Sequence, residues 1–222
     1  MGFPNPKPQI PSLYAILDAD IAATAGWTLI DLAAACLAGG ARLLQIRAKD
    51  APSGRLLETS TAIVEQARLA GALTIVNDRA DVARLAGAEG VHVGQDDLSP
   101  AAVRGLVGPD AIVGLSTHTS EQIDKALREP ISYLAIGPIF ATSTKASGYD
   151  PVGLTAVKTA ATRAREHRIP VVAIGGITLE TAADAVAAGA ASVAAISDLL
   201  STGDPEQRVR AYLQRLAGVN NV

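Results

Sequence analysis

The stretch from Gly137 to Lys145 carries the clearest binding chemistry in the sequence. It follows an apolar run at 133–136, where a buried strand is expected, and then changes abruptly to glycine, proline, hydroxyl-bearing residues and one lysine. This composition suits an anion, because small residues let backbone N–H groups approach a ligand and lysine binds phosphate as a point charge. A plain surface loop would have the same composition. The residues expected to contact the anion are Thr142, Ser143, Thr144 and Lys145.

Polar residues also alternate at the end of an earlier apolar run, at Gln45, Arg47 and Lys49. If the chain stays extended there, all three side chains lie on one side of it. Arg47 offers a planar fork for phosphate oxygens, and Lys49 offers a flexible positive charge. The alternative for any one of them is a solvated strand end, with the arginine in a salt bridge.

Carboxylates follow two neighbouring apolar runs, with Asp78 after 73–77 and with Asp96 and Asp97 after 90–93. Taken singly, Asp78 could cap the next helix, and either of the other two could form an Asx turn. Carboxylates on adjacent strands would repel each other unless a cation lies between them. Mg²⁺ takes one or two protein carboxylates together with phosphate oxygens and water, so a magnesium site is expected here.

Glycines and hydroxyls at two later strand ends indicate a separate place for phosphate, at Gly175-Gly176 and at Ile196-Ser197. Each pair follows an apolar run and precedes a helical stretch. In barrels of parallel strands, the loops after the last two strands often bind a phosphate monoester through backbone N–H groups. The sequence therefore predicts two anion sites, one assisted by a metal ion and one without a metal.

Ser116 and the three histidines complete the set of candidate side chains. Ser116 ends an apolar run, where it would hydrogen-bond a substrate or serve as a turn hydroxyl. His118 directly precedes a helix cap, which favours a structural hydrogen bond over acid–base catalysis. His92 alternates with valines and is expected to be a core histidine with satisfied nitrogens. His167 is expected in solvent at a charged helix end.

Composition excludes several classes of partner. The net charge is −3 and neither terminus is strongly basic or acidic, so neither nucleic acid nor a membrane surface is expected as the main partner. No apolar run reaches ~18 residues, so no transmembrane helix is expected. The single cysteine, Cys36, is expected to be buried, and residues 1–11 lack the apolar core of a signal peptide. These features indicate a cytoplasmic protein and leave a homo-oligomer open.

Short β-branched runs alternate with longer Ala- and Leu-rich helical stretches along the whole chain. The runs are almost continuously apolar, as parallel strands covered on both faces are. This pattern predicts an α/β protein with a (β/α)8 TIM barrel as a single domain over 1–222, in which 1–11 form a proline-rich N-terminal arm. A doubly wound open sheet is the alternative. The expected strands are 12–17, 42–47, 73–77, 90–93, 111–115, 132–136, 170–174 and 192–196.

Helix starts support this count of elements. Ser99 precedes a proline and is expected to cap a helix, and Asp204 is placed in the same way. Thr119 followed by Gln122 matches a capping box, in which the two side chains bond reciprocally to backbone N–H groups. The reactive residues of such a barrel gather where strands end and helices have not begun.

Taken together, these segments resemble the thiamine-phosphate synthase family. The resemblance runs in family order over nearly the whole chain. It implies a (β/α)8 barrel that uses Mg²⁺ to join a hydroxymethylpyrimidine diphosphate to a hydroxyethylthiazole phosphate, with release of diphosphate. The matching segments are 44–49, 76–79, 90–97, 114–119, 137–145, 173–178 and 195–197.

The resemblance also implies roles for individual residues, with Asp78 and Asp97 as the ligands of Mg²⁺. Contacts to the pyrimidine substrate are implied for Gln45, Arg47, Lys49, Asn77, Ser116 and Lys145. Contacts to the thiazole phosphate are implied for Thr142, Ser143, Thr144, Gly176, Ile196 and Ser197. Direct roles in catalysis are implied for Arg47, Lys49, Ser116 and Lys145.

The implied reaction needs no side-chain nucleophile, because positioning of two substrates and stabilisation of the departing diphosphate supply the rate. Three alternatives remain on the sequence alone. A thiazole tautomerase of the same superfamily would need His118 as an acid–base group and no metal. The others are a sugar-phosphate isomerase barrel and a non-catalytic barrel that binds a thiamine precursor. The carboxylates Asp78 and Asp97 favour the synthase.

Overall fold

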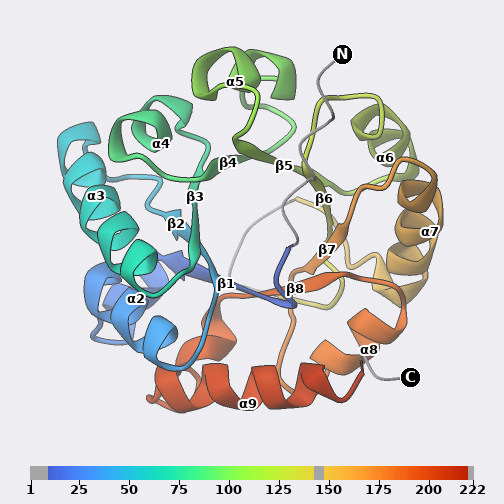
Figure 1. Cartoon of the computed structure of the whole chain (residues 1–222). Coiled ribbons are helices and arrows are strands. Elements are labelled where there is room, and N and C mark those ends of the chain that lie inside the picture. Colours follow the sequence, from blue (N-terminus) through green and yellow to red (C-terminus); the bar gives the residue numbers. More distant parts are fainter. Residues whose placement is uncertain (1–9, 143–147, 220–222) are drawn as a thin grey trace.

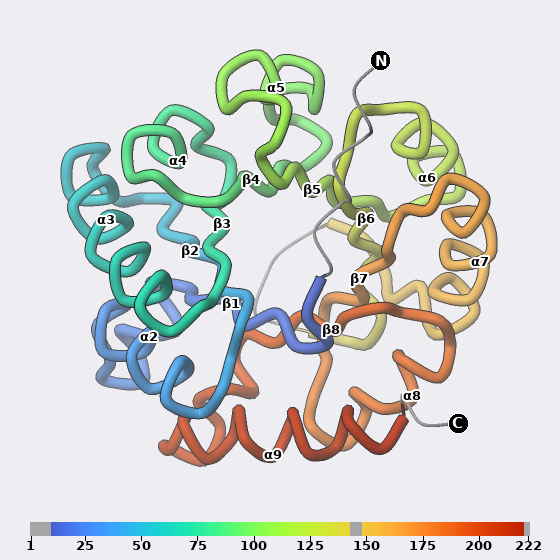
Figure 2. Tube along the Cα trace, viewed as in Figure 1, coloured from blue at the N-terminus to red at the C-terminus, as the bar shows by residue number. Residues whose placement is uncertain are grey.

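Eight short parallel strands pair in sequence order and close into a barrel in the computed structural model, which describes residues 10–142 and 148–219. Figure 1 places the strands at the centre and the helices around them. The barrel closes where β1 pairs with β8, and Figure 2 shows these two strands side by side. The predicted barrel is thus confirmed over the open sheet. The strands are β1 (Leu13–Asp18), β2 (Leu43–Arg47), β3 (Leu73–Asn77), β4 (Gly90–Val93), β5 (Ile112–Thr117), β6 (Tyr133–Ile136), β7 (Val171–Ile174) and β8 (Ser192–Ala195).

Helices fill the intervals between the strands, as the sequence predicts. The first interval holds two helices rather than one, because Asp18 caps α1 and Thr28 caps α2 with their side-chain oxygens. None of the helices in the described part of the chain has both the length and the apolar character needed to span a bilayer. The helices are α1 (Ala19–Thr24), α2 (Leu29–Ala38), α3 (Ser53–Leu69), α4 (Ala80–Ala86), α5 (Pro100–Val107), α6 (Ser120–Ala126), α7 (Gly153–Glu166), α8 (Ala182–Ala187), the 3₁₀ helix η1 (Ser197–Leu200) and α9 (Pro205–Ala217).

Two of the three predicted helix caps form as expected. The side chains of Ser99 and Asp204 each accept a hydrogen bond from a backbone N–H in the first turn of α5 and α9. Thr119 caps α6 by accepting from the N–H of Gln122 at 3.3 Å. The reciprocal bond of a capping box is displaced by one residue, because the Gln122 side chain accepts from the N–H of His118.

Alternate residues of each strand pack into two separate apolar clusters. On β1, Ala15 and Leu17 face the helices and belong to the larger cluster between sheet and helices. Tyr14 and Ile16 point the other way and belong to a smaller cluster inside the barrel. Ile10, near the end of the predicted N-terminal arm, is buried in this inner cluster, whereas residues 1–9 lie outside the described part of the chain.

Strand β5 is longer than the sequence predicts, since it continues past the expected range 111–115 to Thr117. Serine and threonine there suggest a turn, but Ser116 pairs with Ala135 of β6 in the sheet register. The hydroxyl of Thr117 also donates to the carbonyl oxygen of Ala135 at 2.8 Å. Pairing with β6 therefore overrides local preference and holds Ser116 on rigid backbone.

Candidate active site

Two cavities lie at the C-terminal ends of the strands and share part of their walls. The acidic cavity lies over β2 to β5, and the glycine cavity lies over β5 to β8; Ser116 and His118 line both. The acidic cavity is lined by Lys49, Asn77, Asp78, His92, Gly94, Gln95, Asp96, Asp97, Ser116, His118 and Tyr149. The glycine cavity is lined by Ser116, Thr117, His118, Gly137, Pro138, Thr142, Ile174, Gly175, Gly176, Ile177, Ala194, Ile196 and Ser197.

Asp78 adopts an uncommon backbone conformation, with φ of +61°. Left-handed backbone is unfavourable for a residue with a side chain, and such residues concentrate at functional sites. Its N–H donates to the carbonyl oxygen of His92 at 2.8 Å, which ties the ends of β3 and β4 together. The N-cap position of α4 belongs to Arg79, so the sequence alternative of Asp78 as the helix cap is wrong.

Asp97 also lines the acidic cavity, from the loop after β4. One oxygen of its carboxylate accepts from the N–H of Gly94 at 2.7 Å, so a turn hydrogen bond and a place in the cavity coexist. The Nζ atom of Lys49 lies 3.6 Å from a carboxylate oxygen of Asp78, and both residues line the same cavity. As expected from their places at strand ends, Asp78, Asp97 and Lys49 line one cavity, together with Asn77.

The donor set of the acidic cavity suits a hard cation that keeps much of its water. No group of three or more His, Cys, Asp or Glu side chains within residues 10–142 and 148–219 is arranged to hold a metal ion. Asp78 and Asp97 would therefore supply carboxylate oxygens only, and other ligands would have to come from water and phosphate. Mg²⁺ is commonly bound in this way, so the residues present fit it.

Arg47 is held by a partner that sequence reasoning missed. Its guanidinium forms a short ion pair with Asp18, whose other carboxylate oxygen accepts from two N–H groups at the start of α1. The two side chains are 13% and 3% exposed, and the Nε atom of Arg47 is buried with no hydrogen-bond partner. The signal for Asp18 was available, because it too is a carboxylate at the end of an apolar run.

Five side chains form a hydrogen-bonded chain across the inside of the barrel, from Gln45 through Tyr14, Tyr133 and His92 to Ser116. The successive donor–acceptor distances are 2.7, 2.9, 2.8 and 2.8 Å. All five residues are buried. Burial raises the pKa of both tyrosines, so their hydroxyls stay protonated and remain hydrogen-bond donors. The prediction that His92 is a satisfied core histidine is confirmed.

The donor and acceptor groups of these five side chains indicate which residue donates to which along the hydrogen-bonded chain. The amide nitrogen of Gln45 donates to Tyr14, and the arrangement that then gives every proton of this hydrogen-bonded chain an acceptor has Tyr14 donating to Tyr133. Tyr133 in turn donates to Nδ1 of His92, which leaves the histidine proton on Nε2 to be donated to Ser116. The hydroxyl proton of Ser116 is thereby left for an acceptor in the cavities.

Gly114 makes room for the centre of this chain. A Cβ atom at Gly114 would lie 2.1 Å from the ring of Tyr133 and 2.6 Å from Nδ1 of His92. Any side chain there would separate the two rings, which stack with centroids 5.5 Å apart. The roles of Tyr14 and Tyr133 were not predicted from the sequence, although a tyrosine at an inward position of a buried strand needs a partner for its hydroxyl.

His118 is engaged in structural contacts, as predicted. Its Nδ1 atom pairs with the carbonyl oxygen of Gly137. The backbone N–H of His118 donates to the side-chain oxygen of Gln122 at 2.7 Å. Its ring stacks on that of Tyr149 with centroids 4.1 Å apart. These contacts join the ends of β5 and β6 and fix the wall that separates the two cavities.

Backbone rather than side chains forms much of the glycine cavity. Gly176 has φ of +66°, and a Cβ atom there would lie 2.6 Å from the carbonyl oxygen of Ala141. Only glycine lets the loop after β7 pass so close to the segment after β6. Thr142, Ile196 and Ser197 line the same cavity, as expected for a phosphate site. The remaining predicted contacts lie outside the described residues, namely Ser143, Thr144 and Lys145.

The fold and these adjoining cavities define a (β/α)8 barrel enzyme with its candidate site at the C-terminal ends of the strands. The chain matches the family model described as thiamine monophosphate synthase over residues 13–199, and it belongs to that family. The resemblance inferred from the sequence is therefore confirmed.

Named relatives agree with the family match. Thiamine-phosphate synthase of Koribacter versatilis is 45% identical over 94% of this chain and 97% of its own length. That of Chlorobium luteolum is 41% identical over 93% of both chains. A solved thiamine phosphate pyrophosphorylase from Pyrococcus furiosus superposes with a TM-score of 0.86 at 27% identity, covering 97% of this chain and 99% of the other.

Proposed function

We propose that this chain condenses a hydroxymethylpyrimidine diphosphate with a hydroxyethylthiazole phosphate to give thiamine phosphate and diphosphate. The observation that carries the proposal is the pair of cavities, one lined by carboxylates and a lysine, the other by glycine backbone, with a shared wall. Two substrates seated on either side of that wall would have their reacting atoms next to each other. Membership of the family and the names of its relatives support the same reaction.

The pyrimidine diphosphate would bind in the acidic cavity. When bound by Asp78 and Asp97, Mg²⁺ would neutralise charge on the diphosphate oxygens. Lys49 is half-exposed on a flexible stem and would turn from Asp78 towards a phosphate oxygen. Arg47 is fixed by Asp18 and would add a stationary positive charge at the end of β2. Asn77, Gln45 and Lys145 complete the proposed contacts.

The bond changes balance without an acid or a base. The bond between the pyrimidine methylene carbon and the diphosphate oxygen breaks, and diphosphate keeps the electron pair. The pyrimidine ring delocalises the resulting cation, and the lone pair of the thiazole nitrogen forms the new carbon–nitrogen bond. The Ser116 hydroxyl would donate a hydrogen bond to an oxygen of the departing group and keep its proton, because His92 already donates to the Ser116 oxygen.

The thiazole phosphate would bind in the glycine cavity. Backbone at Gly176, Ile196 and Ser197 lines the cavity, and small-residue loops of this kind hold phosphate through N–H groups. Thr142 would add a hydroxyl, and the proposal extends the same role to Ser143 and Thr144. Much of the rate gain would come from holding both substrates in register.

Product formation tests the proposal directly. The purified protein, given both substrates and Mg²⁺, is expected to release thiamine phosphate and diphosphate in equal amounts, and EDTA is expected to abolish turnover. Binding of both substrates without product at saturation would refute the enzymatic role and favour a binding protein. Turnover indifferent to EDTA would refute the metal assignment alone. The proposal also places the enzyme in the cytoplasm, in keeping with the free, buried Cys36.

A further inference from the structure

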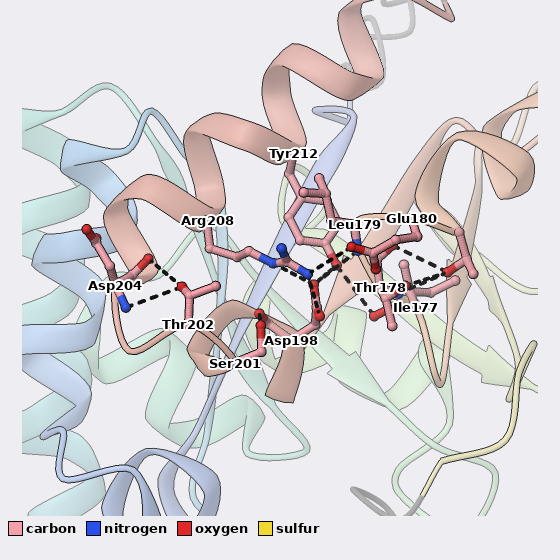
Figure 3. A network of polar contacts seen from close by, with 11 residues as sticks. Ile177, Thr178, Leu179, Glu180, Asp198, Ser201, Thr202, Asp204, Arg208 and Tyr212 are labelled. Carbon is pink, nitrogen blue, oxygen red and sulfur yellow. Dashed lines mark hydrogen bonds and ion pairs between the residues drawn. The ribbon is translucent and has the colours of Figure 1, made fainter.

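One largely buried carboxylate, that of Asp198, joins the segments after β7 and β8 to the last helix. Figure 3 shows it at the centre of a network of polar contacts beneath α9. One of its oxygens accepts from Nη2 of Arg208 at 2.8 Å. The other accepts from Nε of Arg208 at 3.0 Å, from the hydroxyl of Tyr212 at 2.6 Å and from the N–H of Leu179 at 3.1 Å.

These contacts reach both backbone segments of the glycine cavity. Asp198 directly follows Ser197, which lines that cavity. Leu179 lies in the loop after β7, two residues beyond Ile177, which also lines it. The hydroxyl of Tyr212 lies 3.5 Å from the carbonyl oxygen of Ile177 as well. The carboxylate therefore fixes the loop after β7 against the segment after β8.

Apolar packing also attaches α9 to the barrel, independently of this network. The helix already buries Val209 and Leu216 completely against the core. The side chains of Asp198 and Arg208 are only 10% and 13% exposed, and a largely buried ion pair adds little net stability because both charges lose water. What a fork of two parallel hydrogen bonds does supply is a fixed geometry.

We infer that Asp198 and Arg208 are a positioning pair, which sets the spacing of the Gly176 and Ser197 backbones and so determines the affinity for the thiazole monophosphate. The inference rests on the proposed function, in that it takes the glycine cavity as the monophosphate site. Neither residue lines either cavity among the described residues, so both act through the loops they hold.

The test is a comparison of the two Michaelis constants in variants of the pair. Asp198→Asn and Arg208→Gln should each raise the KM for the thiazole phosphate roughly tenfold or more, because small misplacements of a binding group are costly, while the KM for the pyrimidine diphosphate stays within about twofold. Arg208→Lys keeps the charge without the fork and should restore part of the affinity. The double variant should be no worse than the more severe single variant.

Two control variants on the same helix separate positioning from stability. Arg210→Gln removes an exposed arginine that pairs with Glu206 one turn away, and it should leave both KM values unchanged. Leu216→Ala removes buried packing without touching the network, and it should lower the thermal midpoint without changing the ratio of the two KM values. If Asp198→Asn does not fold, Tyr212→Phe removes one hydrogen bond to the carboxylate and should raise only the thiazole KM.

Failure of the inference can be told from failure of the proposed function. Gly176→Ala obstructs the cavity loop itself and should raise the thiazole KM more than any variant of the pair. If Gly176→Ala has this effect but Asp198→Asn and Arg208→Gln change neither KM, or change both equally, the positioning role is refuted. If Gly176→Ala folds and leaves the thiazole KM unchanged, the monophosphate binds elsewhere and both claims fall.

Discussion

Tyr133→Phe would break the hydrogen-bonded chain inside the barrel at its centre. The Tyr14 hydroxyl would lose the acceptor for its proton, and Nδ1 of His92 would lose its donor, with both groups buried. Each buried polar group left without a partner costs about 1–3 kcal/mol, so two of them predict a loss of about 2–6 kcal/mol in the free energy of unfolding. For a chain of this length, each kcal/mol lowers the thermal midpoint by about 2–4 °C, so the midpoint should fall by roughly 4–24 °C.

Urea and thermal unfolding of the variant and the parent protein measure this loss. Tyr149→Phe is the matched control, because it removes the same atom from a ring that is 41% exposed, and it should change stability by no more than about 0.5 kcal/mol. A Tyr133→Phe protein as stable as the parent would refute the reasoning. The buried hydroxyl would then carry no hydrogen bond that matters to the barrel.

Nitrogen NMR of the His92 ring tests the direction of the chain. The proton is expected on Nε2, with Nδ1 bare and accepting from Tyr133. A proton on Nδ1 would reverse the chain, and Ser116 would then give its own proton to the histidine instead of to a ligand. Turnover of Tyr133→Phe should also fall, because Ser116 would lose its fixed orientation.

Three further predictions follow from the site and the core. Asp78→Asn and Asp97→Asn should each lower kcat at least about a hundredfold with little change in thermal midpoint, and turnover retained in both would contradict the magnesium assignment. Arg47→Gln should lower the free energy of unfolding by about 3–5 kcal/mol, since it leaves the buried Asp18 carboxylate without its counter-charge, and adding Asp18→Asn should recover part of that in urea titrations. Burial raises the pKa of the Cys36 thiol to about 12, so a thiol reagent should react only at the rate of unfolding; rapid labelling of the folded protein would disprove its burial.

The order of elements could be predicted because each strand is covered on both faces and reads as an apolar run. Boundaries were less predictable where pairing outweighs composition, as at Ser116 and Thr117, which continue β5 against β6. The division of the first helical interval into α1 and α2 depends on caps at Asp18 and Thr28, which the apolar pattern does not report.

The candidate site was predictable as far as position along a strand determines position in space. Strand ends of a barrel meet at one rim, and this alone brings Asp78 and Asp97 to one cavity. Partnerships between side chains were not predictable in this way. Tyr14 and Tyr133 are 119 positions apart, and their contact depends on the barrel radius and on the space left at Gly114.

The wall formed by Ser116 and His118 has a consequence for how the reaction would proceed over many cycles. A product that contains the carbon skeletons of both substrates would occupy both cavities and block the binding of either substrate. Thiamine phosphate should therefore compete with each substrate. When it accumulates, its release rather than the supply of either substrate would limit the turnover rate.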